Sequence, residues 1–248
     1  MLVAGFVIWR LRWQHCRALE EAKSLRCKLN EFDRYLGNIT REKDWLLEET
    51  HHRVKNNLQM AISLLNTQYT FLADNEARQA VRNTQHRMFA ISLVYQKLYQ
   101  EDALSTIDMP RYISELLDYL KDEYETEPGI DFDLKTVPLK LDVTLAIPFG
   151  LIITEAISNI FRHAFAGREK GNVYISLQSN DSRQYSLLIK DNGKGLPVSF
   201  DPYGGTSMGW MLMTGLSRQI RGTLHIYNDN GVTVALDFLN DGRLPENL

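Results

Sequence analysis

The sequence predicts a helical hairpin that dimerises into a four-helix bundle, followed by a mixed-sheet α/β sandwich; the fold class is α + α/β. Three observations predict this architecture. A heptad repeat of apolar residues fills the N-terminal part, two amphipathic helical stretches follow over residues 46–104, and alternating strand patterns begin near residue 130. With 248 residues, 44% of them apolar, the chain can fill two modest cores.

The N-terminal segment, residues 1–9, is uniformly apolar and is followed by Arg10, Arg12 and Arg17. It is shorter than half of the roughly twenty residues that cross a bilayer as a helix. We interpret it as the residual end of a truncated membrane helix. The arginines would then leave the remainder in the cytoplasm, anchored at the inner membrane. The alternative is an apolar N-terminus that associates only loosely.

A coiled coil is predicted over residues 10–45, which we interpret as a signalling helix. Apolar residues recur there at alternating steps of four and three, and charged residues fill the flanks. This pattern favours a parallel dimer. Gly37 and Thr40 weaken its middle, and Lys43 interrupts it before Leu46. The seam consists of Ala18, Ala22, Leu25, Leu29, Phe32, Leu36 and Ile39.

Two adjacent histidines begin the basic, asparagine-rich run HHRVKNN on the next helix. His51 falls on that helix's apolar seam, whereas His52 is rotated about 100° from it. An accessible imidazole is a nucleophile that can accept a phosphoryl group, so we predict His52 as the acceptor. Glu48, one turn earlier, is a candidate general base or simply a solvated carboxylate, and Asn56, one turn later, could orient a water or an incoming aspartate.

A short turn at residues 73–75 and a second amphipathic helix over 76–100 complete the predicted hairpin. Because a single hairpin would expose an apolar face, two copies are expected to close into a bundle. The segment 100–110 is the predicted hinge to the α/β sandwich, residues 105–242. That region is expected to place helices on one face of its sheet. The predicted helices are 111–125, 143–165 and 208–221, and the strands are 130–137, 173–178, 185–190, 223–227 and 232–238.

Four polar residues share one predicted helix face: Glu155, Asn159, Arg162 and His163, at i, i+4, i+7 and i+8. An asparagine oxygen is a hard ligand that suits Mg²⁺, and an arginine can neutralise phosphate charge. A carboxylate beside them completes a set that fits a magnesium–triphosphate. A solvated polar face is the alternative, and is the more common meaning of such a stripe taken alone.

The run DNGKG follows an apolar strand and begins with Asp191. Its carboxylate can accept a hydrogen bond from an adenine amino group, while Gly193 and Gly195 let the backbone approach a base. Gly209 lies at the start of a helix after two further glycines, an arrangement that can form a phosphate-binding lid. Taken alone, this run could be an ordinary turn. No Walker-type lysine motif or dinucleotide fingerprint is present.

The order of these motifs is informative: HHRVKNN, then EAISNIFRH, DNGKG, the glycines and Gly222-Thr223. In this order the chain resembles sensor histidine kinases of the two-component type, in the subfamily with the HHRVKNN box and a Bergerat-type (GHKL-like) ATP-binding domain. The resemblance covers residues 42–239. It implies a dimerisation and phosphoacceptor domain over 46–104 and a catalytic ATP-binding domain over 105–242.

The resemblance implies an autokinase that uses ATP and Mg²⁺ to phosphorylate His52 and then passes the phosphoryl group to an aspartate of a response-regulator receiver domain. The protein would act as a homodimer. The implied site residues are Glu155 to polarise water or metal, Asn159 to bind Mg²⁺, Arg162 to contact phosphate, Asp191 to recognise adenine, Gly193 and Gly195 to line the base pocket, Gly209 to anchor the lid and Thr223 to assist the adenine contact.

Three positions depart from the usual pattern of that family: Thr154, Trp210 and Arg53, the last standing where many histidine kinases have an acidic residue. Two alternatives stay open, a non-enzymatic dimeric nucleotide-binding module and a Bergerat-type ATPase. The net charge of −3 and pI near 6.1 give no basic field for a nucleic acid. The two cysteines, Cys16 and Cys27, indicate a reducing compartment and helix packing.

Overall fold

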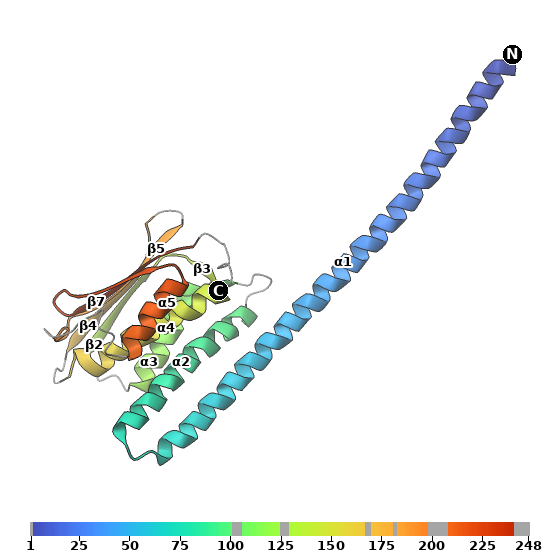
Figure 1. The fold of residues 1–248 in the computed structure, drawn as a ribbon. Coiled ribbons are helices and arrows are strands. Elements are labelled where there is room, and N and C mark those ends of the chain that lie inside the picture. The colour runs from blue at the N-terminus through green and yellow to red at the C-terminus, as the bar shows by residue number, and fades with distance from the viewer. Residues whose placement is uncertain are drawn as a thin grey trace. The chain divides into compact units, whose positions relative to one another are not determined.

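The computed structural model describes residues 2–100, 106–124, 129–166, 170–180, 183–197 and 208–240. The chain divides into two compact units, Met1–His51 and His52–Leu248. The first unit is a single helical rod, and the second contains the hairpin and a mixed sheet (Figure 1). The predicted fold class is therefore confirmed.

Helix α1, Leu2–Phe71, runs for 70 residues without a break and begins in the first unit. Gly37 lies within it and does not interrupt the helix, and a Cβ placed on this glycine would meet nothing within 4 Å. The described residues of the heptad seam are exposed, from 73% at Leu25 to 44% at Ile39. Cys27 is exposed with a free thiol, whereas the side chains of Cys16, Ala18 and Ala22 lie outside the described residues.

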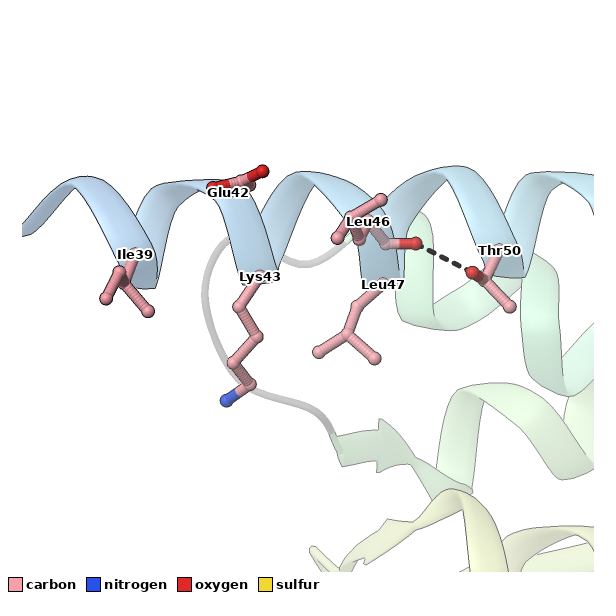
Figure 2. A pocket seen from close by; sticks show the side chains of 6 residues that line it. All are labelled: Ile39, Glu42, Lys43, Leu46, Leu47 and Thr50. Atoms are coloured by element: carbon pink, nitrogen blue, oxygen red, sulfur yellow. Dashed lines mark hydrogen bonds between the residues drawn. The ribbon is translucent and has the colours of Figure 1, made fainter.

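An apolar groove follows the same helix near the end of the first unit. It is lined by Ile39, Glu42, Lys43, Leu46, Leu47 and Thr50. Figure 2 shows Ile39, Lys43 and Leu47 projecting from one side of the helix. The lysine stem thus continues the apolar surface across the predicted interruption of the seam.

The hairpin is closed by a short turn between α1 and helix α2, Asn75–Gln100. Asp74 caps α2, because its Oδ2 accepts a hydrogen bond from Ala77 N at 2.9 Å. Between the two helices, Gln85 Nε2 donates to Asn66 Oδ1 at 2.6 Å. The predicted turn and second helix are found within one residue of the expected positions.

The sheet has five strands in the order β2-β4-β5-β7-β6, with β2 parallel to β4 and the other neighbours antiparallel. Helices α3, α4 and α5 lie together on one face of it (Figure 1). This is the predicted mixed sheet with one covered face. The bounds are α3 Met109–Glu123, β2 Ile130–Thr136, α4 Val143–Asn159, β4 Gly171–Ser179, β5 Gln184–Asp191, α5 Met208–Gln219, β6 Thr223–Asn228 and β7 Val232–Leu239.

Two short strands were not predicted. Strand β1, Thr106–Asp108, pairs antiparallel with β3, Lys140–Asp142, in a separate two-stranded sheet. Both strands end at a helix N-cap: Asp108 accepts from Arg111 N, and Asp142 accepts from Thr144 N and Leu145 N. This small sheet therefore fixes the starts of α3 and α4 together.

Helix α4 is the centre of the core, with Phe149, Ile152, Ile153 and Ile157 fully buried. Among the described residues, the stretch Val143–Ala164 is the one helical segment long and apolar enough to cross a membrane. Because 72% of its apolar window is buried inside the domain, we assign it to the core. Membrane attachment through residues 1–9 stays a prediction.

Helix α2 packs on the sheet domain, mainly on α4 and α3. Ala90, Leu93 and Val94 are buried, and the buried hydroxyl of Tyr112 on α3 donates to Ala90 O at 3.1 Å. His52–Leu248 therefore cluster as one compact unit, and the boundary between the domains 46–104 and 105–242 stays a prediction. The sequence did not show this, because the apolar face of α2 fits either a bundle or a sheet-covering helix equally well.

Candidate nucleotide site and acceptor helix

The polar stripe lies where α4 ends in a π turn, η1 Ile160–Ala164. Within it, Arg162 Nη2 donates to Asn159 Oδ1 at 3.1 Å, and Arg162 Nε donates to Ser158 O at 3.1 Å. The predicted neighbours Asn159 and Arg162 are thus brought together. Exposure differs along the stripe: Glu155 is buried and His163 is exposed.

His163 is therefore the predicted ligand that fits the stripe least. Partial burial lowers the pKa of His163, and the positive charges of Arg162 and Lys194 lower it further. Its imidazole is accordingly neutral near pH 7, which removes the second cationic group that the sequence suggested. Arg162 supplies the positive charge of this region beside Asn159.

Glu155 is only 3% exposed and pairs with Arg87 of α2, whose Nε lies 2.6 Å from Glu155 Oε1. Its other oxygen faces the start of α5, since a Cβ placed on Gly209 would lie 2.8 Å from Oε2. Gly209 thus meets Glu155 directly. Sequence reasoning missed Arg87, because nothing in the spacing of two residues 68 positions apart indicates a contact.

Asp191 ends β5 and is 2% exposed. Its Oδ1 accepts hydrogen bonds from Gly193 N at 2.8 Å and from Val232 N at 3.2 Å. These two donors fix the orientation of a buried carboxylate. A carboxylate held by one oxygen in this way can offer the other to a hydrogen-bond donor such as an exocyclic amino group.

The glycines of the DNGKG run have separate structural causes. A Cβ on Gly193 would lie 2.4 Å from Ala164 O, and Lys194 N donates to the same oxygen at 3.0 Å. Gly193 therefore packs the loop against the π turn, and its role in lining a base pocket stays a prediction. Gly195 has a φ of +78°, a conformation that favours glycine.

Two residues that support this loop were not singled out from the sequence. Gly231 has a φ of +134°, and a Cβ there would lie 2.0 Å from Asp191 O. Asn228 holds the backbone of Leu196, accepting from its N at 2.7 Å and donating to its O at 3.2 Å. The only sequence signal for them was the run Asn228–Gly231 between two strands. Such a run is typical of an ordinary hairpin turn and does not indicate contact with the Asp191 loop.

The structure corrects the predicted adenine contact of Thr223. It begins β6 opposite Asp237, whereas the Asp191 end of the sheet is marked by Asn228 opposite Val232. Five residues of strand, about 16 Å, separate the two ends. Thr223 is therefore too far from Asp191 to share an adenine contact. Thr233 on β7 is close in register, opposite Lys190, and its buried hydroxyl has no hydrogen-bond partner among the described residues.

The acceptor helix carries its candidates in the expected order along α1. His51 and His52 are both half-buried in the single chain, so exposure does not distinguish them. Glu48 and Asn56 are exposed. The choice between the histidines therefore still depends on the helical phase of the apolar seam.

Two family profiles match consecutive parts of the chain. The profile described as "Histidine kinase" matches residues 49–124, and the one described as "Histidine kinase-, DNA gyrase B-, and HSP90-like ATPase" matches residues 144–241. The first contains both histidines and α2, and the second contains Asn159, Asp191 and the glycines. The chain belongs to the histidine kinase family.

Relatives agree with this assignment. The sensor histidine kinase PdtaS of Mycolicibacterium smegmatis is 30% identical over 193 residues, 75% of this chain and 37% of the relative. The blue-light-activated histidine kinase 2 of Erythrobacter litoralis is 26% identical over 164 residues, 64% of this chain and 46% of the relative. The chain thus spans less than half the length of these curated relatives.

The fold also agrees with a solved structure. The histidine kinase domain of the Erythrobacter litoralis EL346 blue-light activated histidine kinase superposes with a TM-score of 0.60 at 20% identity. The match covers 74% of this chain and 95% of that domain. At this identity the likeness supports the fold alone: a helical region followed by the ATPase-type sheet domain.

Proposed function

We propose that this protein is an ATP-dependent histidine autokinase of a two-component system. It transfers the γ-phosphoryl group of ATP to His52 and then to an aspartate on a response-regulator receiver domain. One observation carries the proposal: the Asp191 loop packs, through Gly193, against the π turn that follows Asn159 and contains Arg162. This packing supports our proposal that Asp191 binds the base and that the end of α4 binds the phosphates in a single site.

The residues fit a magnesium–ATP substrate. Asp191 would accept a hydrogen bond from the adenine amino group, and the unpaired buried hydroxyl of Thr233 marks a polar position nearby. Asn159 would give its Oδ1 to Mg²⁺ once Arg162 turns to the phosphates. Gly209, against Glu155, would anchor the lid at the start of α5.

The transfer step is a substitution at phosphorus. An unprotonated ring nitrogen of His52 attacks the γ-phosphorus, the bond to the β–γ bridging oxygen breaks, and ADP leaves. We propose Glu48 as the group that accepts a proton from the imidazole and Asn56 as an orienting residue for the next acceptor. Catalysis would come mainly from positioning the reactants and from neutralising the negative charge of the phosphates. Mg²⁺, when bound, would supply part of the positive charge that neutralises them.

The dimer is the second part of the proposal. The exposed seam of α1 contains large apolar side chains every third or fourth residue, and a second copy of the same helix covers such a seam in a parallel coiled coil. The groove in Figure 2 extends this surface toward the histidines. We propose attachment to a membrane, N-terminal to this coiled coil, through residues 1–9.

The test uses γ-labelled ATP with Mg²⁺ and the full chain. Label should appear on the protein, be lost in acid and be stable in base, as a phosphoimidazole requires. His52→Ala should abolish it, whereas His51→Ala, the matched control, should keep it. Asn159→Ala should abolish it through loss of the metal ligand.

Acid-stable label, or label that persists in His52→Ala, would reject the autokinase assignment. Steady release of ADP that is undiminished in His52→Ala would instead support the alternative of a Bergerat-type ATPase. ATP binding without either label or ADP would support a non-enzymatic module.

A further inference from the structure

The docking of α2 on the sheet domain involves polar contacts as well as apolar ones. Arg82 Nη2 donates to Glu123 O at 2.9 Å, and the buried Lys97 pairs with Glu115 of α3. Between these two contacts lie the buried Ala90, Leu93 and Val94. One helix of the phosphoacceptor hairpin is thus also a core element of the ATP-binding region.

The pair Arg87–Glu155 is the contact of this interface that reaches the nucleotide site. Arg87 lies in the part that matches the histidine kinase profile, and Glu155 in the part that matches the ATPase profile. The Glu155 side chain is 3% exposed and that of Arg87 is 19% exposed. A carboxylate this deeply buried is strongly destabilised unless a cation pairs with it, and here the cation comes from the hairpin.

The pair also selects which carboxylate oxygen remains for chemistry. Arg87 Nε is 2.6 Å from Oε1, whereas Oε2 faces the first turn of α5 at Gly209. One helical turn after Glu155 stands Asn159, the proposed Mg²⁺ ligand. Oε2 is therefore the oxygen on the side of α5, and a side chain larger than that of Gly209 would displace it.

We propose that Arg87 is a positioning residue for phosphoryl transfer: from the hairpin, it holds Oε1 of Glu155 and so directs Oε2 toward Gly209 and the nucleotide. This inference rests on the proposed autokinase function. It makes the catalytic site complete only when α2 is docked, so that the hairpin supplies a positioning group in addition to the acceptor histidine.

The experiment compares Arg87→Gln with Arg82→Gln in the full chain. Both variants remove an arginine contact between α2 and the sheet domain, but only Arg87 touches Glu155. The initial rate of His52 labelling at saturating ATP should fall between about tenfold and a hundredfold in Arg87→Gln. ATP affinity, measured with a fluorescent analogue, should stay within about threefold, a difference below about 0.7 kcal/mol.

Two further variants separate positioning from folding. Arg87→Lys keeps the cation and should recover part of the rate. In a Glu155→Gln background, adding Arg87→Gln should change the labelling rate by less than about twofold, because the group that Arg87 positions is gone.

A labelling rate in Arg87→Gln that is unchanged or faster would overturn the inference, since a faster rate would mean that the pair restrains the domain. An equal loss in Arg82→Gln, or full additivity with Glu155→Gln, would also overturn it. If the unmodified protein labels His52, these results reject the role of Arg87 alone. If it does not label, the proposed function itself has failed.

Discussion

The two compact units treat the same kind of side chain in opposite ways. In the unit before His52, Leu25 is 73% exposed and Phe32 is 57% exposed, although both stand on a regular apolar seam. In the unit that follows, Leu116 and Ile152 are fully buried by elements of the same chain. Apolar periodicity is equally clear in both, but the second unit contains surfaces that cover its core, although Met60, Leu64 and Phe71 of its hairpin stay exposed.

The difference indicates two kinds of stability. The second unit buries its core within one chain, so its unfolding should be independent of protein concentration. The seam of the first unit is stabilised only when a second copy covers it, so its folding should follow mass action. Each prediction below tests one side of this comparison.

The largest effect is expected in the buried unit. Leu116→Ala, at a residue with no exposure, should lower the free energy of unfolding by about 2–5 kcal/mol through lost burial and a cavity. Denaturant unfolding, followed by far-ultraviolet circular dichroism at two protein concentrations, measures this change in the free energy of unfolding. Leu29→Ala is the control on the exposed seam, and an equal loss there at low concentration would contradict the comparison.

The next effect concerns pH and His86, a fully buried residue of α2. Burial, together with the smaller effects of the charges of Arg82 and Arg162, lowers the pKa of His86 to about 4, although Glu123 Oε2 lies 3.7 Å from Nε2. Above pH 6.5 both folded and unfolded states hold the neutral imidazole, so this contribution to stability is complete there. As pH falls from 6.5 to 4, the unfolded state gains the proton first and stability declines.

The expected loss across this interval is about 3 kcal/mol for the unit that contains His86. Thermal unfolding at a series of pH values measures it. His86→Phe removes the titrating group from its aromatic surroundings, Tyr119 and Tyr124, and should flatten the decline. A decline of the same size in His86→Phe would assign the pH dependence to other groups.

A smaller effect is expected on the seam. Leu29→Asp places a charge in each helix of the proposed dimer, facing its copy, and should weaken association by about 1–3 kcal/mol. Sedimentation equilibrium measures the change in the dimer constant. Glu31→Gln, on the flank, is the matched control, and an unchanged dimer constant in Leu29→Asp would remove the seam from the interface.

The smallest effect is expected at Gly37, within the exposed helix and with open space around it. Gly37→Ala should stabilise the helix by about 1 kcal/mol, because alanine loses less conformational entropy than glycine. Thermal unfolding of the full chain, followed by circular dichroism, should show a higher melting temperature for the first helical transition. A lower temperature would show that Gly37 meets a close neighbour in the dimer.

Most of the fold could be predicted from the sequence, because it depends on local patterns. These are the helix and strand periodicities and the Asp and Pro residues that mark where helices begin and end. The turn at Asp74, the helix at Val143 and the strand that ends at Asp191 were all expected near their observed bounds. The docking of α2 on α3 and α4 could not be predicted, since the sequence of an apolar helix face does not identify the surface that will cover it.

The site was predicted in part for the same reason. Asn159, Arg162 and Asp191 lie within short motifs, and the structure brings the first two into contact. Arg87 and Thr233 reach the site through tertiary packing and strand register, which no spacing in the sequence encodes. Thr223 was singled out because it directly follows Gly222 before a strand, whereas Thr233 follows Val232 and gives no such signal.

The most direct test of the central claim is to locate the phosphoryl group after a short incubation with ATP and Mg²⁺. Peptide mapping by mass spectrometry, performed without acid, should place it on the imidazole of His52 in the unmodified protein and in His51→Ala. Modification of His51 instead, or of a hydroxyl side chain, would contradict the account.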